Sequence, residues 1–302
     1  MDEGIRPPYL KQNDKVLLIS PASKIDRKLI KGMFNRLKSW GLRPIIGKHA
    51  SAKSGTFSGS IRQRLSDLQY GLDHKSIKAI FCTRGGYGTI QLIQDLCFDK
   101  FKKTPKWLIG YSDVTVLHNI IANYNINSVH GPMARHFTMA PKEDLSLELL
   151  KKALFGEQMN YIIKGHKYNQ KGDVKGRLIG GNLTILASLL STNLNAVRSG
   201  DILYIEDINE NSNQVERMLY SFQLSGILNY ISGVIIGQFT WQYKREGEQE
   251  KVYQRINRLI KHLRIPIAYN FPIGHGDVNY PLVNGSLVHF VVRKNVVELN
   301  FI

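Results

Sequence analysis

Residues 106–123 (KWLIGYSDVTVLHNIIAN) join a short apolar run to a helical pattern through a polar turn. The run at 106–111 predicts a buried strand, and residues 114–123 repeat apolar side chains at the spacing of a helix. Parallel strands need a crossover connection, usually a helix, so a strand that leads directly into a helix favours a parallel sheet. This stretch therefore predicts an α/β fold.

The same alternation is found three times upstream of this stretch. Apolar runs predict strands at 15–20, 43–46 and 77–83, and helical spacing predicts helices at 26–40, 61–72 and 89–96. Nearly continuous apolar strands are typical of a sheet that helices cover on both faces. We therefore expect an N-terminal α/β domain with a parallel sheet of the flavodoxin or Rossmann type.

The pattern changes downstream of about residue 161. Residues 164–176 (KGHKYNQKGDVKG) are polar and contain glycine, which favours a linker or a hairpin. Two final strand patterns joined by Lys294-Asn295 predict a hairpin, and hence some antiparallel sheet. We therefore expect an N-terminal domain over 1–163, a linker over 164–176 and a mixed α/β domain over 177–302. In the second domain the sequence predicts strands at 202–205, 233–237, 286–293 and 296–301, and helices at 183–191, 215–224 and 252–263.

The charge of the chain first suggests a polyanionic partner. Its 302 residues include 41 Lys and Arg against 24 Asp and Glu, a formal net charge of +17. A basic balance of this size raises the question of nucleic acid or an anionic membrane surface. The basic residues are spread over both halves, however, and the densest run, residues 100–106 (KFKKTPK), resembles a solvated loop. We therefore expect neither nucleic acid nor a membrane as a partner.

Cysteine content and hydropathy indicate the compartment. Cys82 and Cys97 are too few to cross-link a chain of this length, and neither has the spacing of a metal site. Residues 1–12 do not resemble a signal peptide, and no run reaches the roughly 18 apolar residues of a membrane span. We expect a soluble, cytoplasmic protein.

A glycine-rich loop follows the predicted strand at 77–83. Residues 84–88 (RGGYG) would lie at the carboxyl edge of the sheet, where open parallel sheets bind their ligands. Three glycines allow positive φ angles and expose backbone N–H groups, which suits an anion or an oxyanion. The spacing matches neither a dinucleotide fingerprint nor a P-loop. A plain tight turn with a helix cap explains this loop equally well.

A second loop, residues 110–113 (GYSD), follows the next predicted strand. A serine at a sharp strand-to-helix turn is where α/β hydrolases place their nucleophile, although Val114 stands where that motif has its second glycine. Taken alone, the turn favours a simpler interpretation, because Ser112 and Asp113 are both residue types preferred as helix N-caps.

A nucleophilic serine needs a base and a carboxylate that orients the base. Of nine histidines, His118 and His289 lie in a predicted helix and a predicted strand, which is typical of structural residues. His130 and His275 lie in loops with Gly and Pro, where functional residues concentrate. Glu206 ends a predicted strand and would present a carboxylate at the sheet edge, unless it serves as a helix-start carboxylate. The residues alone leave the base undecided between His130 and His275.

Seven segments, in order along nearly the whole chain, resemble the LD-carboxypeptidase family of serine peptidases. That family includes the muramoyl-tetrapeptide carboxypeptidases and, as a divergent branch, the microcin C immunity proteins. The specificity lies in the ordered set rather than in any single motif. The segments are VLLISPAS at 16–23, TRGGYG at 83–88, IGYSDVTVLH at 109–118, HGPM at 130–133, GGNLTIL at 180–186, LYIEDINE at 203–210 and FPIGHG at 271–276.

The resemblance implies a role for residues of three of these motifs. Ser112 of the GYSD turn would be the nucleophile, Glu206 of the ED pair would orient the base, and His275 of the GH loop would be that base. The order Ser, Glu, His along the chain agrees with the hydrolase logic above. Ser112 would then lie in the first domain, and Glu206 and His275 in the second. The family also implies a homodimer and no metal or other cofactor.

The resemblance further implies an oxyanion hole made of backbone N–H groups. These would belong to Asp113 and to a glycine of the RGG loop, Gly86 or alternatively Gly85. A carboxypeptidase must also bind the free carboxylate of its substrate, for which Arg84 and Arg135 are candidates; capping by either arginine is as plausible.

We therefore expect a serine carboxypeptidase that cleaves the L,D bond to the terminal D-alanine of a muropeptide tetrapeptide during cell-wall recycling. One alternative within the family is a hydrolase of a peptide–nucleotide antibiotic or a related amide. A second alternative is a non-catalytic α/β module that binds a nucleotide or nucleic acid. Residues 211–214 (NSNQ) depart from the family pattern, which leaves substrate selectivity open.

Overall fold

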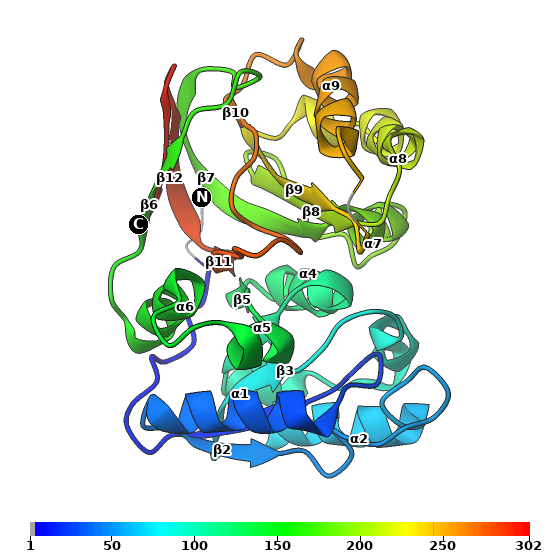
Figure 1. The fold of residues 1–302 in the computed structure, drawn as a ribbon, viewed down its shortest axis with the longest axis vertical. Coiled ribbons are helices and arrows are strands. Elements are labelled where there is room, and N and C mark those ends of the chain that lie inside the picture. The colour runs from blue at the N-terminus through cyan, green and yellow to red at the C-terminus, as the bar shows by residue number, and fades with distance from the viewer. Residues whose placement is uncertain (1–3, 244) are drawn as a thin grey trace. The chain divides into compact units, whose positions relative to one another are not determined.

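The computed structural model describes residues 4–243 and 245–302. The chain divides into two compact units, and each unit is made of more than one segment of the chain. The first contains residues 5–157 and 280–283, and the second contains residue 4 with residues 158–279 and 284–302. Each unit has its own sheet (Figure 1).

The first unit is built on a six-stranded sheet with the order β11-β5-β4-β3-β1-β2. Strands β1 to β5 pair in parallel throughout. The order 2-1-3-4-5 is that of flavodoxin-like folds, so the predicted fold class is confirmed for this unit. The strands are β1 (Lys15–Ile19), β2 (Arg43–Ile46), β3 (Ile77–Cys82), β4 (Trp107–Gly110), β5 (Ser128–His130) and β11 (Leu282–Asn284).

Helices connect these strands, and three helices of this unit begin at side-chain caps. The Asp26 carboxylate accepts a hydrogen bond from the Lys28 N–H at the start of α1, and Ser60 forms a capping box with Gln63 at the start of α2. The helix predicted at 89–96 is a 3-10 helix instead, a form that short segments often take. The helices are α1 (Arg27–Ser39), α2 (Ile61–Asp73), η1 (Thr89–Asp95), α3 (Asp99–Lys103), η2 (Ser112–Val114), α4 (Thr115–Asn123), α5 (Ala134–Met139) and α6 (Leu145–Phe155).

The second unit is built on a seven-stranded mixed sheet with the order β10-β9-β8-β7-β12-β13-β6. Strands β7 to β10 are parallel, whereas β12, β13 and β6 add antiparallel pairs. The predicted hairpin at Lys294-Asn295 joins β12 to β13 and is confirmed. Its elements are β6 (Asn160–Lys164), β7 (Gly172–Asn182), α7 (Leu183–Leu189), β8 (Ile202–Ile208), α8 (Ser212–Leu224), η3 (Ile227–Asn229), β9 (Gly233–Thr240), α9 (Glu248–Ile260), β10 (Ile267–Ala268), β12 (Leu287–Val292) and β13 (Val296–Phe301).

The segment 164–176, expected as a linker or hairpin, lies inside the second unit. It contains the end of β6, a turn, and the first residues of β7. Strand β7 pairs with β8 and β12, so the polar side chains of its first half belong to a sheet rather than to a linker. The division between the units comes earlier, at residues 157 and 158. Alternating exposure along residues 172–176 explains why this strand resembles a loop in sequence.

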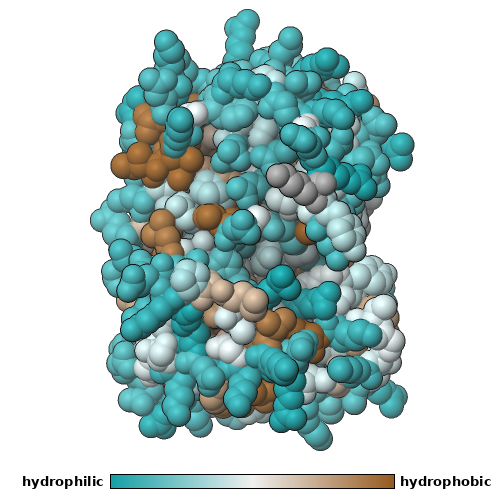
Figure 2. Space-filling view, in the orientation of Figure 1, coloured by the Kyte–Doolittle hydropathy of each residue, from teal (hydrophilic) through white to brown (hydrophobic). Residues whose placement is uncertain are grey.

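Apolar side chains fill the interior of each unit. In the first unit Phe81 and Trp107 are at most 1% exposed, and in the second Tyr204 and Phe290 are fully buried. Hydrophilic residues cover most of the face seen in Figure 2, with hydrophobic residues in separate patches. Across the described parts of the chain, none of the helices combines the length and the apolar character needed to cross a membrane.

Candidate active site

The loops after β3 and β4 lie at the carboxyl edge of the first sheet. In a sheet of order 2-1-3-4-5 the strand order reverses between β1 and β3, and ligands bind outside the carboxyl ends of the strands near this point. The RGGYG loop follows β3 directly, and Ser112 follows β4 after one residue. The structure therefore places both predicted loops where the fold favours a site.

The backbone of Ser112 is strained. Its φ angle is +63°, in the left-handed region that non-glycine residues rarely adopt. Ser112 ends the turn after β4 and begins η2, which continues into α4. A strained serine between a strand and a helix is the geometry of a nucleophile elbow, which exposes the hydroxyl above the sheet edge.

The interpretation of this turn as an N-cap is wrong. Neither η2 nor α4 has a side-chain hydrogen bond at its N-cap. The Asp113 carboxylate turns instead to the preceding loop, where Oδ2 accepts a hydrogen bond of 2.8 Å from the Thr89 N–H at the start of η1. Asp113 thus caps a helix that lies 24 residues earlier in the chain, which a local sequence pattern does not reveal.

The RGG turn lies against Ser112. A Cβ atom placed on Gly85 would lie 2.9 Å from Ser112 Cβ and 3.1 Å from the Asp113 backbone nitrogen. Gly86 has a φ angle of +97°, and a Cβ atom there would lie 2.3 Å from Ser23 Oγ. The Tyr87 N–H donates to the same Ser23 hydroxyl at 3.2 Å. Only glycine fits these two positions, so the loop after β3 is shaped to approach the predicted nucleophile closely.

The second unit brings Glu206 and His275 together. His275 Nδ1 lies 2.8 Å from Glu206 Oε2, and the Glu206 side chain is fully buried. An ionised carboxylate only accepts hydrogen bonds, so Nδ1 carries the proton in this pair and Nε2 carries the lone pair that can act as a base. This pair distinguishes His275 from His130 as the base candidate, a choice that the residues alone left open.

Charges around His275 favour its protonated form. Burial of the imidazole lowers its pKa, but attraction to Glu206, the hydrogen bond from Nδ1 and attraction to Asp207 outweigh burial, so the pKa of His275 is raised. A raised pKa makes the neutral imidazole a stronger base, which favours removal of a proton from a hydroxyl group.

Asp207 is a second buried carboxylate beside this pair. It accepts hydrogen bonds from Asn182 Nδ2 at 2.7 Å and from the N–H and hydroxyl of Thr184. Burial, together with repulsion from Glu206, raises the pKa of Asp207 to about 6. Asp207 therefore fixes the start of α7 to strand β8, and its charge adds to that of Glu206.

Two histidines of the first unit, His118 and His130, are fully buried. His118 lies 2.8 Å from Ser128 Oγ through Nδ1 and 2.8 Å from the Gly110 carbonyl through Nε2. Burial lowers the pKa of His118 to about 4, so the ring is neutral, and Nε2 donates to the carbonyl two residues before Ser112. His118 is structural, as its place in a helix predicted, and His130 is fully buried at the end of β5.

Sequence reasoning missed Arg64, a buried cation on α2. It shares a helix face with Leu68 and Leu72, and its side chain is 2% exposed. An arginine at the spacing of an apolar stripe is an available signal, because buried arginines need several hydrogen-bond partners. Arg84, a candidate for the substrate carboxylate, is exposed and donates to the Lys24 carbonyl at 2.5 Å.

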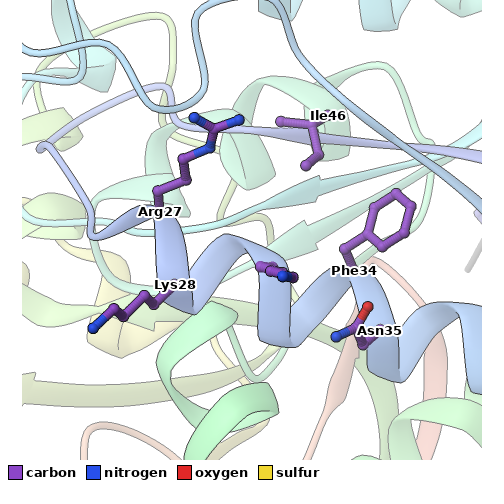
Figure 3. Close-up of a pocket in the computed structure, with 6 residues that line it drawn as sticks. Arg27, Lys28, Phe34, Asn35 and Ile46 are labelled. Atoms are coloured by element: carbon purple, nitrogen blue, oxygen red, sulfur yellow. The ribbon is translucent and has the colours of Figure 1, made fainter.

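A surface groove of about 490 Å³ lies elsewhere on the first unit, between α1 and the end of β2 (Figure 3). Arg27 and Phe34 extend from α1 on the same side as Ile46, whereas Lys28 extends away. None of the predicted site residues lines this groove. Its lining residues are Arg27, Lys28, Lys31, Phe34, Asn35 and Ile46.

Comparison with known proteins identifies both units. Residues 16–131 match the LD-carboxypeptidase N-terminal domain, and residues 175–290 match the LD-carboxypeptidase C-terminal domain. The murein tetrapeptide carboxypeptidase of Pseudomonas aeruginosa is 31% identical over 280 residues, which cover 88% of this chain and 89% of that protein.

Solved structures give the same result. The muramoyltetrapeptide carboxypeptidase of Oxalobacter formigenes superposes with a TM-score of 0.86 at 26% identity, covering 95% of this chain and 98% of that one. The MccF-like protein of Bacillus anthracis also gives a TM-score of 0.86, at 21% identity, covering 99% of this chain and 100% of that one, and so shares the fold.

Proposed function

Since the chain belongs to the LD-carboxypeptidase family and is a serine-type carboxypeptidase, we propose that it removes the terminal D-alanine from muropeptide tetrapeptides in cytoplasmic cell-wall recycling. The products are a tripeptide and free D-alanine. Ser112 is the nucleophile, and Glu206 with His275 supplies the base.

The backbone of Ser112 is the observation that carries this proposal. A φ angle of +63° at a serine costs about 1–3 kcal/mol and persists only where the surrounding structure enforces it. A helix cap needs no such strain, because N-cap residues adopt extended backbone angles. A nucleophile elbow does need it, because the sharp turn lifts Oγ away from the sheet.

The proposed reaction follows from which of these groups accepts and which donates a proton in each step. His275 Nε2 takes the Ser112 hydroxyl proton as Oγ attacks the carbonyl carbon of the L-centre. The carbonyl electron pair moves to oxygen, where the N–H groups of Asp113 and Gly86 bind the oxyanion. The C–N bond then breaks, and the imidazolium gives its proton to the nitrogen of D-alanine. Water, deprotonated by the same imidazole, hydrolyses the ester and returns Ser112 to its hydroxyl form.

Glu206 orients His275 and stabilises its charged form in this reaction. Its hydrogen bond to Nδ1 holds the tautomer in which Nε2 is the base, and its charge stabilises the imidazolium formed in each half of the reaction. Gly85 lies closest to Ser112 among the loop glycines described above, so its N–H is the alternative donor to that of Gly86.

Product analysis tests the substrate. Disaccharide-free tetrapeptides that contain either diaminopimelate or lysine are incubated with the protein, and products are identified by mass spectrometry. We expect the tripeptide and free D-alanine from at least one of them. Hydrolysis of an aminoacyl sulfamoyl adenylate without D-alanine release from either tetrapeptide would contradict the proposal and favour the antibiotic hydrolase. Salt-dependent nucleic-acid binding without any hydrolysis would favour a binding module.

A further inference from the structure

The Gly88–Thr89 peptide group is held from both sides by buried charged side chains. Arg64 Nη1 donates to the Gly88 carbonyl at 2.8 Å. The Thr89 N–H of the same peptide group donates to Asp113 Oδ2 at 2.8 Å. Arg64 and Asp113 are each 2% exposed, so both bonds are protected from water. A single peptide at the end of the RGGYG loop thus links helix α2 to the residue after the predicted nucleophile.

Arg64 also holds the loop that follows β1. Its Nη1 donates a second hydrogen bond to the Pro21 carbonyl at 2.9 Å, and Nη2 donates to Gln91 Oε1 at 2.7 Å. Its guanidinium carbon lies 4.8 Å from the centre of the Phe57 ring. Burial lowers the pKa of Arg64, and attraction to Asp113 opposes that change. One guanidinium therefore fixes loops from two neighbouring strands, which the single ammonium of a lysine does not match in geometry.

Gly88 leaves no room for adjustment at this point. Its φ angle is +127°, and a Cβ atom there would lie 2.8 Å from Arg64 Nη1. The Gly88 backbone therefore packs closely against the guanidinium group of Arg64. Gly86, a proposed oxyanion donor, lies two residues before Gly88, and Asp113 supplies the other proposed donor from its own backbone N–H. The two donors are thus connected through one peptide group and the two side chains that hold it.

We propose that Arg64 and Asp113 form a clamp on the Gly88–Thr89 peptide that sets the spacing between the two oxyanion donors. Both are positioning residues in this role: Asp113 acts through its carboxylate, separately from its backbone N–H. This inference rests on the proposed function, because it assigns the donors of that reaction. Oxyanion stabilisation depends on donors preorganised at hydrogen-bond distance from the oxyanion, so a loosened clamp affects the transition state more than bound substrate.

Kinetic and binding measurements on Arg64→Gln and Asp113→Asn test the clamp. Loss of one oxyanion donor costs about 10²–10³ in kcat, so a displaced donor is expected to cost about 10–100-fold in kcat for each variant. KM should change less than about threefold, since substrate binding does not use the oxyanion. Affinity for a tetrapeptide phosphonate, which resembles the tetrahedral intermediate, should fall by the same factor as kcat/KM. Arg62→Gln, which removes an exposed arginine from the same helix, should leave both values unchanged.

A double variant distinguishes the clamp from two separate structural roles. Because both residues hold one peptide, Arg64→Gln combined with Asp113→Asn should lose little more than the worse single variant. Independent effects that multiply would contradict the clamp. Where Arg64→Gln folds poorly, Arg64→Lys keeps the charge and lacks the fork, and kcat is measured below its melting temperature. A lower melting temperature with normal kcat and normal phosphonate affinity would overturn the proposal.

Failure of the clamp proposal can be distinguished from failure of the proposed function. If the wild-type protein releases no D-alanine from either tetrapeptide, the proposed function fails, and if Ser112→Ala still releases D-alanine, the assignment of the nucleophile fails. If Ser112→Ala is inactive while Arg64→Gln and Asp113→Asn keep full kcat, only the clamp fails.

Discussion

The two units place their functional groups by different physical means. In the first unit, Ser112 is positioned by backbone geometry: a positive φ angle, and a neighbouring glycine turn so close that a Cβ atom at Gly85 would lie 2.9 Å from Ser112 Cβ. In the second unit, His275 is positioned by a 2.8 Å hydrogen bond to Glu206, beside the buried charge of Asp207. Backbone shape thus positions Ser112, and charge positions His275.

This difference predicts which changes each unit tolerates. Substitutions that add atoms without changing charge should damage the Ser112 turn and leave the His275 pair intact. Removal of a charge at constant volume at Glu206 or Asp207 should instead impair the His275 pair and leave the Ser112 turn intact. The predictions below test that contrast, and the substitutions of Glu206, Gly85 and Asp207 each have a control of the same chemical type.

Among the substitutions that test this contrast, the largest effect is expected for Glu206→Gln. An amide cannot stabilise the imidazolium and favours the wrong tautomer, so kcat should fall by a factor of about 10⁴ with little change in KM. D-alanine release is measured against Glu210→Gln, which removes a carboxylate four residues away. A Glu206→Gln variant that retains more than a tenth of wild-type kcat would show that the second unit does not depend on this charge.

A smaller effect is expected for Gly85→Ala. The added methyl group would lie 2.9 Å from Ser112 Cβ and 3.1 Å from the Asp113 nitrogen, so the turn or the loop must move. This movement takes an oxyanion donor out of its place, and loss of one such donor costs about 10²–10³ in kcat, with the pH profile unchanged. Gly226→Ala is the control, because it adds a methyl group in open space at a positive φ angle and so tests backbone strain alone. Full activity of Gly85→Ala would refute the steric account.

The pH profile of kcat/KM tests the charge account of the second unit. The base must be neutral to accept a proton, so activity rises with pH through the pKa of His275. Because that pKa is raised, the midpoint should lie above 6.5. A midpoint at or below 6.5 in the wild-type protein would show that the attraction of Glu206 and Asp207 does not outweigh burial.

The smallest effect is a shift of this midpoint in Asp207→Asn. With a pKa of about 6, Asp207 is mostly ionised at pH 7, and its charge helps to raise the pKa of His275. Its removal should move the acidic limb to lower pH while kcat on the plateau changes less than about threefold. Asp277→Asn, an exposed carboxylate two residues from His275, should move the midpoint less. If the midpoint shifts equally in the two variants, the burial of Asp207 does not strengthen its effect on the pKa of His275.

Local patterns in the sequence predicted the first sheet well. Strands β1, β2 and β3 and helices α1 and α2 begin and end within two residues of their predicted positions. These elements are apolar runs and helical stripes, whose signal is contained in the element itself. Strands β5 and β11 are three residues long and depend on pairing with distant segments, so no local pattern reveals them.

The candidate site could be predicted by residue type but not by geometry. Resemblance supplied Ser112, Glu206 and His275, and the residues alone left His130 open as the base. The hydrogen bond from the Thr89 N–H to Asp113 joins residues 24 positions apart, and the Gly85 turn that lies against Ser112 belongs to the loop after a different strand. The role of Arg64 also depends on a distant segment, because its hydrogen bond to the Gly88 carbonyl joins residues 24 positions apart.

D-alanine release by folded Ser112→Ala is the most direct test of Ser112 as the nucleophile of this carboxypeptidase. The variant removes one oxygen atom and keeps the turn, and its fold is checked by its melting temperature. We expect kcat to fall by a factor of about 10⁴–10⁶, to the residual rate of a serine hydrolase without its nucleophile. D-alanine release within about tenfold of the wild-type rate would contradict the account.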